Sequence, residues 1–302
     1  MNLFSELLFV GPGYSSVRAE ILSLPTLAPT NCSVPTSIIP EKYYGYVATV
    51  MSHGVLLCGG EIWPRYGHSY NVNKCFLLTN AGFWLSSPPI ASMLTSRTEA
   101  AAVSFAGGWW VIGGKNESSK ALASTEVYYE KNNSWVASVD YPEPVYGHCA
   151  VKLNTTHVFF ASGSSSTAYT TAYIYSREGG FVKQENMKTR RKYHACSLYD
   201  DKVFVVGGYG GDDDVEYFSL SLLSWENAPS VAPPLPINSA GGELLVLGGS
   251  LTYFSKHKKI FKMRKIMWNT FTRYEWQELE ELSKSTSSFK ILRWRINCTA
   301  WN

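Results

Sequence analysis

The sequence predicts an all-β fold, a six-bladed propeller formed by a single domain over residues 1–302. Three observations predict it: an aromatic-rich composition, an apolar run ending in glycine that recurs along the chain, and tight-turn residues before the runs. Phe, Trp and Tyr make up 14% of the 302 residues, and such side chains suit the pleated, half-buried surface of a sheet. Hydrophobic residues at 45% and charged residues at 17% indicate an ordered globular protein.

The glycine-ended runs set the number of blades. Measured at the last glycine of each run, consecutive copies are separated by 47, 54, 49, 45 and 41 residues. The runs are LLFVGPG (7–13), VLLCGG (55–60), WWVIGG (109–114), VFFASG (158–163), VFVVGG (203–208) and LLVLGG (244–249). A period of about 50 residues is typical of one propeller blade, so we expect six blades with each run as the second strand.

Turn residues and aromatics define the remaining strands. The pairs before the runs suit two-residue hairpin turns, and they are His53-Gly54, Gly107-Gly108, Asp200-Asp201 and Gly241-Gly242. The start of each fourth strand is expected at an aromatic residue: Trp84, Trp135, Phe181, Trp225 and Trp276. Each unit is therefore predicted to be a four-stranded antiparallel sheet, with strands a to d numbered outward from the axis.

The two ends of the chain are predicted to meet in blade 1. This blade begins at its strand b, LLFVG, and SSFKILRWRINC (287–298) falls where a strand a is needed. Pairing of the two would close the propeller and remove the exposed sheet edges that favour aggregation. The start, MNLFSELLFVGPG, does not resemble a signal peptide. Because blade 1 also begins abruptly, we expect the N-terminus to be truncated.

The repeat resembles the kelch repeat, and the resemblance covers nearly the whole chain. The glycine pairs, the spacing and the later aromatic residues carry it. The Tyr-Asp pair and the downstream Arg that are usual in the family are poorly kept. The resemblance implies a kelch-type propeller, closed in blade 1 by the C-terminal strand.

Six cysteines suggest disulfides, although six allow fifteen pairings. Cys58 ends strand b of blade 2 and Cys75 begins strand c, so the two should lie opposite each other. Cys149 and Cys196 lie on the a strands of blades 4 and 5, one residue out of step, as a bridge between facing sheets requires. Cys32 and Cys298 remain as a pair that could lock blade 1. The alternative is six buried free thiols.

Five Asn-X-Ser/Thr sequons are candidates for N-glycosylation: Asn31, Asn116, Asn132, Asn154 and Asn297. The middle three fall on predicted hairpin tips, where glycans can be carried. The segments NCSVP (31–35), CGG (58–60) and HAC (194–196) are similar to those of a group of secreted or ectodomain kelch proteins of invertebrates. That resemblance implies an extracellular protein with disulfides.

Several kinds of chemistry are disfavoured. The net charge of +3 is too small to indicate nucleic-acid binding, and no apolar run reaches the length of a membrane span. GGYGG (207–211) lacks the Lys-Ser/Thr of a phosphate-binding loop. His148 and His194 occupy equivalent repeat positions, where a structural role is favoured over metal binding. We therefore expect no cofactor and no metal.

The sequence favours a non-enzymatic binding module that presents loops of one propeller face to an unknown extracellular protein or glycan. Trp, Tyr and Arg are the usual anchors of interfaces, and the candidates are Trp63, Arg65, Tyr66, Arg190, Arg191, Tyr209 and Asp212. Two alternatives stay open. One is an intracellular kelch adaptor of the BTB or F-box type, and the other is a copper enzyme resembling galactose oxidase, which shares the kelch fold.

Overall fold

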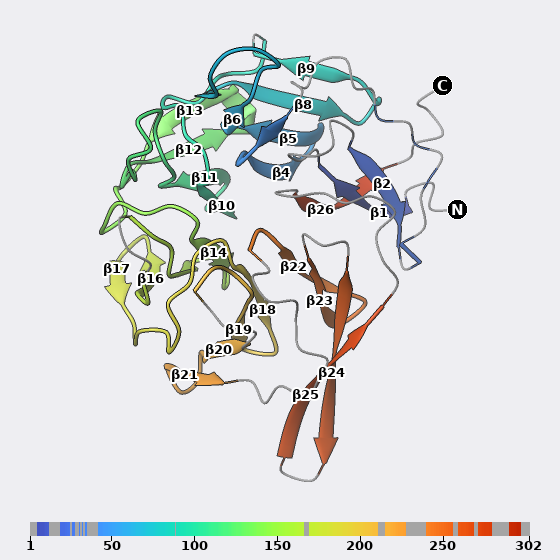
Figure 1. Ribbon diagram of the computed structural model, residues 1–302, viewed down its shortest axis with the longest axis vertical. Coiled ribbons are helices and arrows are strands. Elements are labelled where there is room, and N and C mark those ends of the chain that lie inside the picture. The colour runs from blue at the N-terminus through green and yellow to red at the C-terminus, as the bar shows by residue number, and fades with distance from the viewer. Residues whose placement is uncertain are drawn as a thin grey trace. The chain divides into compact units, whose positions relative to one another are not determined.

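In the residues that it describes, the computed structural model contains β-strands and one short 3₁₀-helix, η1 (Glu130–Asn132) (Figure 1). The residues that it describes are 5–11, 19–24, 26–27, 30, 32, 34, 42–87, 89–165, 169–210, 215–227, 240–255, 259–268, 271–279 and 290–296. Within these ranges, no helix has the length and apolar character needed to cross a membrane. The chain forms two compact units, Met1–Glu143 with Thr286–Asn302, and Pro144–Ser285.

The first unit contains blades 1 to 3 and one small additional sheet. Blade 1 is β26 (Ile291–Ile296), β1 (Ser5–Val10) and β2 (Glu20–Ser23). Blade 2 is β4 (Val47–Met51), β5 (Gly54–Cys58), β8 (Cys75–Thr79) and β9 (Trp84–Ser86). Blade 3 is β10 (Ala101–Phe105), β11 (Gly108–Ile112), β12 (Thr125–Tyr129) and β13 (Ser134–Ala137). The additional sheet is β3 (Tyr43–Tyr44), β6 (Glu61–Ile62) and β7 (Tyr70–Asn71).

The second unit contains blades 4 to 6, each with four strands. Blade 4 is β14 (Cys149–Lys152), β15 (His157–Ala161), β16 (Ala172–Ser176) and β17 (Gly180–Lys183). Blade 5 is β18 (Ala195–Tyr199), β19 (Lys202–Val206), β20 (Glu216–Ser219) and β21 (Ser224–Asn227). Blade 6 is β22 (Glu243–Leu247), β23 (Ser250–Phe254), β24 (Ile260–Trp268) and β25 (Phe271–Glu278).

The C-terminal strand completes blade 1, as predicted. β26 pairs antiparallel with β1 over six residues, from Ser5 opposite Ile296 to Val10 opposite Ile291. Phe9 and Trp294 are buried and make an edge-to-face contact with ring centroids 6.4 Å apart. The two ends of the chain therefore share one sheet and one hydrophobic core.

Blade 6 departs from the predicted register. The run LLVLGG was expected to be strand b, but it forms strand a, β22. Gly248 and Gly249 make the turn to β23, and Ser255 follows β23 where Gly59 follows β5. Gly248-Gly249 at this turn looks like a pair that follows strand b, such as Gly207-Gly208, because all four glycines have positive φ. Trp276 also lies late in β25, because β24 and β25 form a long hairpin that projects beyond the sheet (Figure 1).

The glycine pair after strand b has a physical cause. Gly114 and Gly208 have φ of +95° and +97°, a region in which side chains are strained. A Cβ on Gly114 would lie 2.7 Å from the carbonyl oxygen of Thr98, and one on Gly208 would lie 2.8 Å from that of Lys192. The pair is therefore needed where strand b ends against the segment that leads into strand a of the same blade.

The hydrophobic cores lie between neighbouring blades of each unit. One buried cluster joins blades 2 and 3 through side chains such as Val47, Trp109 and Trp135. The corresponding cluster of blades 4 and 5 includes Phe159 and Trp225. Loops at the strand ends are thus held on closely packed sheets.

Candidate binding surface

The b–c loop of blade 2 carries three of the candidate anchors and lies on the additional sheet. β6 and β7 pair with each other, and β6 also pairs with β3. We call residues 63–69, between β6 and β7, the aromatic loop. Tyr66 is 85% exposed and Trp63 is 40% exposed, and Arg65 is also exposed. Exposed large aromatics on a supported loop are suited to contact with a partner.

Trp63 is held at the base of this loop. Its indole Nε1 donates a 2.9 Å hydrogen bond to Glu61 Oε1, and its ring lies 6.2 Å from that of Tyr44. Burial, followed by the nearby Glu61 carboxylate, raises the pKa of Tyr44. Tyr44 therefore remains a neutral phenol at physiological pH. Trp63 therefore packs on the sheet and is also partly exposed, whereas Tyr66 extends into solvent.

The additional sheet is tied to blade 3. Asn71 Nδ2 donates a 3.0 Å hydrogen bond to the carbonyl oxygen of Lys115. Lys115 Nζ also forms a 2.7 Å ion pair with Glu99. These contacts fix the base of the aromatic loop, so less ordering entropy would be lost when it binds.

In the second unit, Tyr209 and Arg190 are exposed beside a cluster of tyrosines and a lysine. The Tyr193 ring lies 6.1 Å from that of Tyr146 and 6.0 Å from that of Tyr209, which is 44% exposed. Lys192 Nζ stands 5.4 Å above the Tyr146 ring and 5.5 Å above the Tyr193 ring. This surface combines cationic and aromatic groups. Asp212 lies outside the described residues, so its place on the surface remains a prediction.

Arg191 was predicted to lie on the binding face, and this is wrong because the residue is fully buried. Its Nη2 forms a 2.7 Å ion pair with Glu216, and Nη1 donates to the carbonyl oxygen of Gly207 at 2.9 Å. Glu216 also accepts hydrogen bonds from the backbone N–H groups of Lys188 and Thr189. Arg191 thus links the d–a loop to strands b and c of blade 5.

Blade 3 contains the same arrangement, which sequence analysis missed. Arg97 Nη2 pairs with Glu126 at 2.8 Å, and Nη1 donates to the carbonyl oxygen of Gly113 at 2.6 Å. Burial lowers the pKa of Arg97, and Glu126 opposes that shift. In both blades the arginine stands 16 residues before the glycine that it binds. Aligning the charged residues at that offset from the glycines would have revealed this arrangement. We call each buried ion pair, Arg97–Glu126 in blade 3 and Arg191–Glu216 in blade 5, an arginine clamp.

Two predicted disulfides are present. Cys58 and Cys75 are directly opposite in β5 and β8, with Cα atoms 4.1 Å apart. Cys149 and Cys196 join β14 to β18, with Cα atoms 6.2 Å apart. Cys298 lies outside the described residues, so the pairing of Cys32 with Cys298 remains a prediction.

Three sequons lie in described turns. Asn132 is exposed in η1 at the β12–β13 turn, and Asn154 is exposed at the β14–β15 turn. Asn116 is half-buried, and its Oδ1 accepts a 3.0 Å hydrogen bond from Lys120 N. Asn31 and Asn297 lie outside the described residues. Glycosylation of all five remains a prediction.

His148 and His194 are buried near the starts of β14 and β18. Burial lowers the pKa of each to about 3, so both imidazoles are neutral. In the described part of the chain, no three His, Cys, Asp or Glu side chains gather at a distance suited to a metal ion.

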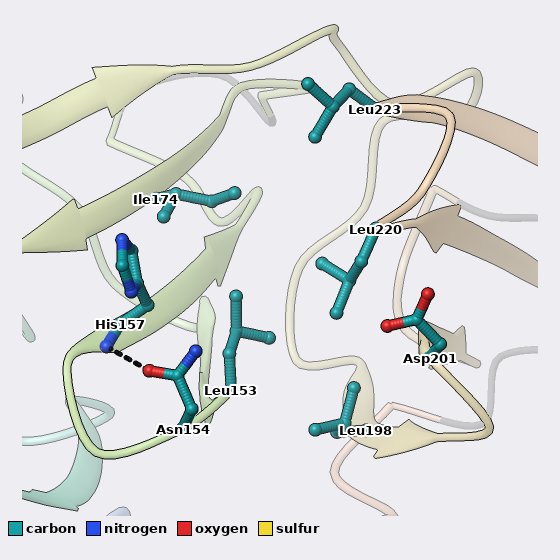
Figure 2. Close-up of a pocket in the computed structure, with 8 residues that line it drawn as sticks. All are labelled: Leu153, Asn154, His157, Ile174, Leu198, Asp201, Leu220 and Leu223. Atoms are coloured by element: carbon teal, nitrogen blue, oxygen red, sulfur yellow. Dashed lines mark hydrogen bonds between the residues drawn. The ribbon is translucent and has the colours of Figure 1, made fainter.

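A groove of about 480 Å³ opens between blades 4 and 5 at the turn end of the strands. Figure 2 shows Leu153 and Ile174 on one side and Leu198, Leu220 and Leu223 on the other. Asn154, His157 and Asp201 are its polar residues. The b–c loops lie at the opposite end of these strands, so the groove is separate from the loop surface.

Comparison with known proteins agrees with this geometry. The family model described as Kelch motif matches residues 190–231. The chain is 28% identical over 159 residues to the Spermatocyte protein spe-26 of Caenorhabditis elegans, a match that covers 52% of this chain and 27% of that protein. The solved structure of YjhT aligns with a TM-score of 0.75 and 10% identity, over 90% of this chain and 95% of that one.

The repeated sheets and the alignment to YjhT define an all-β propeller. Together with the motif match over residues 190–231, they support a kelch-repeat β-propeller. Kelch propellers typically serve as protein-interaction modules. The chain spans about a quarter of the length of the curated relative, since the match covers 27% of it.

Proposed function

We propose that this propeller is a non-enzymatic, extracellular binding module, and that the aromatic loop of blade 2 presents the main contact to a protein or glycan. The observation that carries the proposal is that the base of the aromatic loop is held by contacts within the protein, while its tip is exposed to solvent. Trp63 is anchored by Glu61 and Tyr44, whereas Tyr66 is 85% exposed. Aromatic residues in such positions supply large contact area at a low entropic cost.

The extracellular part of the proposal is supported by the cysteines. Cys58–Cys75 and Cys149–Cys196 are both at disulfide distance. Structural disulfides persist in oxidising compartments and are rare in the cytosol. Exposed sequons at Asn132 and Asn154 are accessible to glycans.

Location is tested on the native protein, recovered with an antibody from the organism that makes it. We expect faster migration on non-reducing than on reducing gels and a loss of mass after glycosidase treatment. Free thiols together with no glycan would reject the extracellular module and favour the intracellular adaptor. Bound copper with alcohol-oxidising activity would favour the galactose-oxidase-like enzyme.

Binding is tested by applying the purified protein to arrays of extracellular domains and glycans. Tyr66→Ala should lower affinity for any partner found by about 2 kcal/mol, the loss expected for a hot spot. Phe83→Ala is the matched control, because Phe83 is a 51% exposed aromatic on the β8–β9 turn at the other end of blade 2. Equal losses in the two variants would contradict the assignment of the loop.

A further inference from the structure

The groove between blades 4 and 5 is more apolar than its exposed position explains. Leu223 is 56% exposed and lines the groove, although it lies on the β20–β21 turn, where polar residues and glycine are usual. Leu153 and Ile174 form the facing wall (Figure 2). These apolar walls can contact a molecule that has an apolar face of its own.

Asn154, the asparagine of a sequon, lies at the rim of this groove. Its Oδ1 accepts hydrogen bonds from Thr156 N at 2.8 Å, Thr156 Oγ1 at 2.9 Å and His157 N at 2.8 Å. All three bonds are accepted by Oδ1, so they fix the orientation of the amide group without using Nδ2. Figure 2 shows Nδ2 on the side of the amide that faces Leu153 and the groove.

We propose that the groove holds the proximal sugars of an N-linked glycan on Asn154. The proposal rests on the extracellular location argued under the proposed function. In the modification, Nδ2 forms a bond to C1 of N-acetylglucosamine and releases one proton. The bond from C1 to the pyrophosphate of a lipid-linked donor breaks, and its electron pair stays on the pyrophosphate, which leaves. The product keeps Oδ1 as an acceptor, so the three hydrogen bonds of the turn are retained.

The chemistry of the groove suits a sugar. A pyranose ring has an apolar C–H face and a rim of hydroxyl groups. The leucine and isoleucine walls match the face, and His157 and Asp201 can bond to the rim. The groove has a volume of about 480 Å³, which lies in the range of small-molecule pockets. This volume is enough for one or two sugar rings.

Asn132 provides an internal control. It lies in η1 with exposed neighbours Lys131 and Asn133, and none of the three lines the groove. A glycan there would extend into solvent, whereas one on Asn154 would be partly covered. The two sites therefore differ in how easily an enzyme can remove the glycan from the folded protein.

The experiment uses the native glycoprotein and measures glycan release from each site by mass spectrometry during digestion with peptide N-glycosidase under native conditions. We expect release at Asn154 to be about tenfold slower than at Asn132, the factor given by about 1.4 kcal/mol of contact with the groove. Equal rates after denaturation would show that the difference comes from the fold.

Two leucine variants, secreted from a eukaryotic cell line, test the groove itself. Leu223→Ser should bring release at Asn154 to the rate at Asn132. Leu222→Ser should leave it slow, because Leu222 is 69% exposed on the same turn but does not line the groove. Release at equal rates from both sites in the unmodified protein would overturn the proposal, as would equal effects of the two variants.

The outcomes also separate this proposal from the proposed function. If Asn132 and Asn116 carry glycans and Asn154 does not, only the groove proposal fails. If no sequon of the native protein is glycosylated, the extracellular location fails as well. A change from dimer to monomer in Leu223→Ser, measured by sedimentation, would assign the groove to a second copy of this chain and overturn its assignment to the glycan.

Discussion

Blades 2 and 3 of the first unit and blades 4 and 5 of the second are joined by the same polar contacts but are cross-linked at different places. Glu99 N donates to the carbonyl oxygen of Gly45 at 2.7 Å, and Tyr193 N donates to that of Gly147 at the same distance. An arginine clamp is present in blade 3 and in blade 5. The polar contacts are thus properties of the repeat.

The disulfides differ between the two pairs of blades. Cys58–Cys75 lies within blade 2, whereas Cys149–Cys196 joins blade 4 to blade 5. Since either placement is compatible with the same backbone bonds, the cross-links are additions to a common scaffold. The two disulfides should therefore differ in how much they add to the free energy of unfolding, whereas the two arginine clamps should make similar contributions.

The clamps should have the largest effect on stability. Arg191→Met leaves the buried Glu216 carboxylate without its cation and should lower the free energy of unfolding by about 3–5 kcal/mol. Arg97→Met should cost at least as much, because Arg97 makes the corresponding bonds to Glu126 and Gly113 and further bonds to Ser124. Urea denaturation measures both.

The neighbouring arginine is a matched control for the clamp. Arg190 is exposed, so Arg190→Met should change stability by no more than about 0.5 kcal/mol. In the double variant Arg191→Met/Glu216→Leu, part of the loss should be recovered, because no buried charge is left unpaired, while the N–H groups of Lys188 and Thr189 lose their acceptor. A double variant as unstable as the single one would show that the clamp does not act as an ion pair.

The disulfides come next and should differ from each other. Cys149 and Cys196 are 47 residues apart and Cys58 and Cys75 are 17 apart. Loop-closure entropy then predicts losses of about 4 kcal/mol for the first pair and about 3 kcal/mol for the second, when each is replaced by alanines. The reverse order in urea denaturation would mean that packing, not chain entropy, sets the difference.

Acid should weaken the second unit through two histidines. Burial lowers the pKa of His148 and His194 from 6.5 to about 3. Between these values the unfolded chain binds protons that the folded chain does not, so stability falls as pH falls from 6.5 towards 3. Each histidine should cost about 1.6 kcal/mol between pH 6.5 and 5.

His148→Gln isolates this effect, because glutamine does not titrate. The slope of unfolding free energy against pH should become shallower by about 1.4 kcal/mol per pH unit below pH 6. An unchanged slope would show that His148 does not contribute to acid sensitivity. The carboxylates are the same in both proteins and cancel in the comparison.

Features that depend on strand order could be predicted from the sequence. The closure of blade 1 by β26 and the Cys58–Cys75 pair follow from antiparallel pairing and the repeat spacing. The register of blade 6 could not be predicted, because Gly248-Gly249 at an a–b turn reads the same as a pair after strand b. Both places require positive φ and therefore favour glycine, so the presence of two glycines does not show which of the two places they occupy.

The binding surface was partly predictable for a similar reason. Residue type suggested both Arg190 and Arg191 as anchors, but one is exposed and the other is buried. Burial depends on the partner carboxylate of Glu216, which lies 25 residues further along the chain. The additional sheet under Trp63 was missed because β3, β6 and β7 are two residues each, too short for a pattern.

The aromatic loop gives the smallest expected effect on stability. Tyr66 is 85% exposed, so Tyr66→Ala should change the free energy of unfolding by no more than about 0.5 kcal/mol. Trp63→Ala should cost more, since it removes the bond to Glu61 and the contact with Tyr44. Urea denaturation of the two variants distinguishes a residue that is only exposed to a partner, Tyr66, from one that also holds the loop in place, Trp63. If Tyr66→Ala proved as destabilising as Trp63→Ala, the loop would be part of the scaffold that joins blades 2 and 3, and its exposed tip could no longer be assigned to a partner.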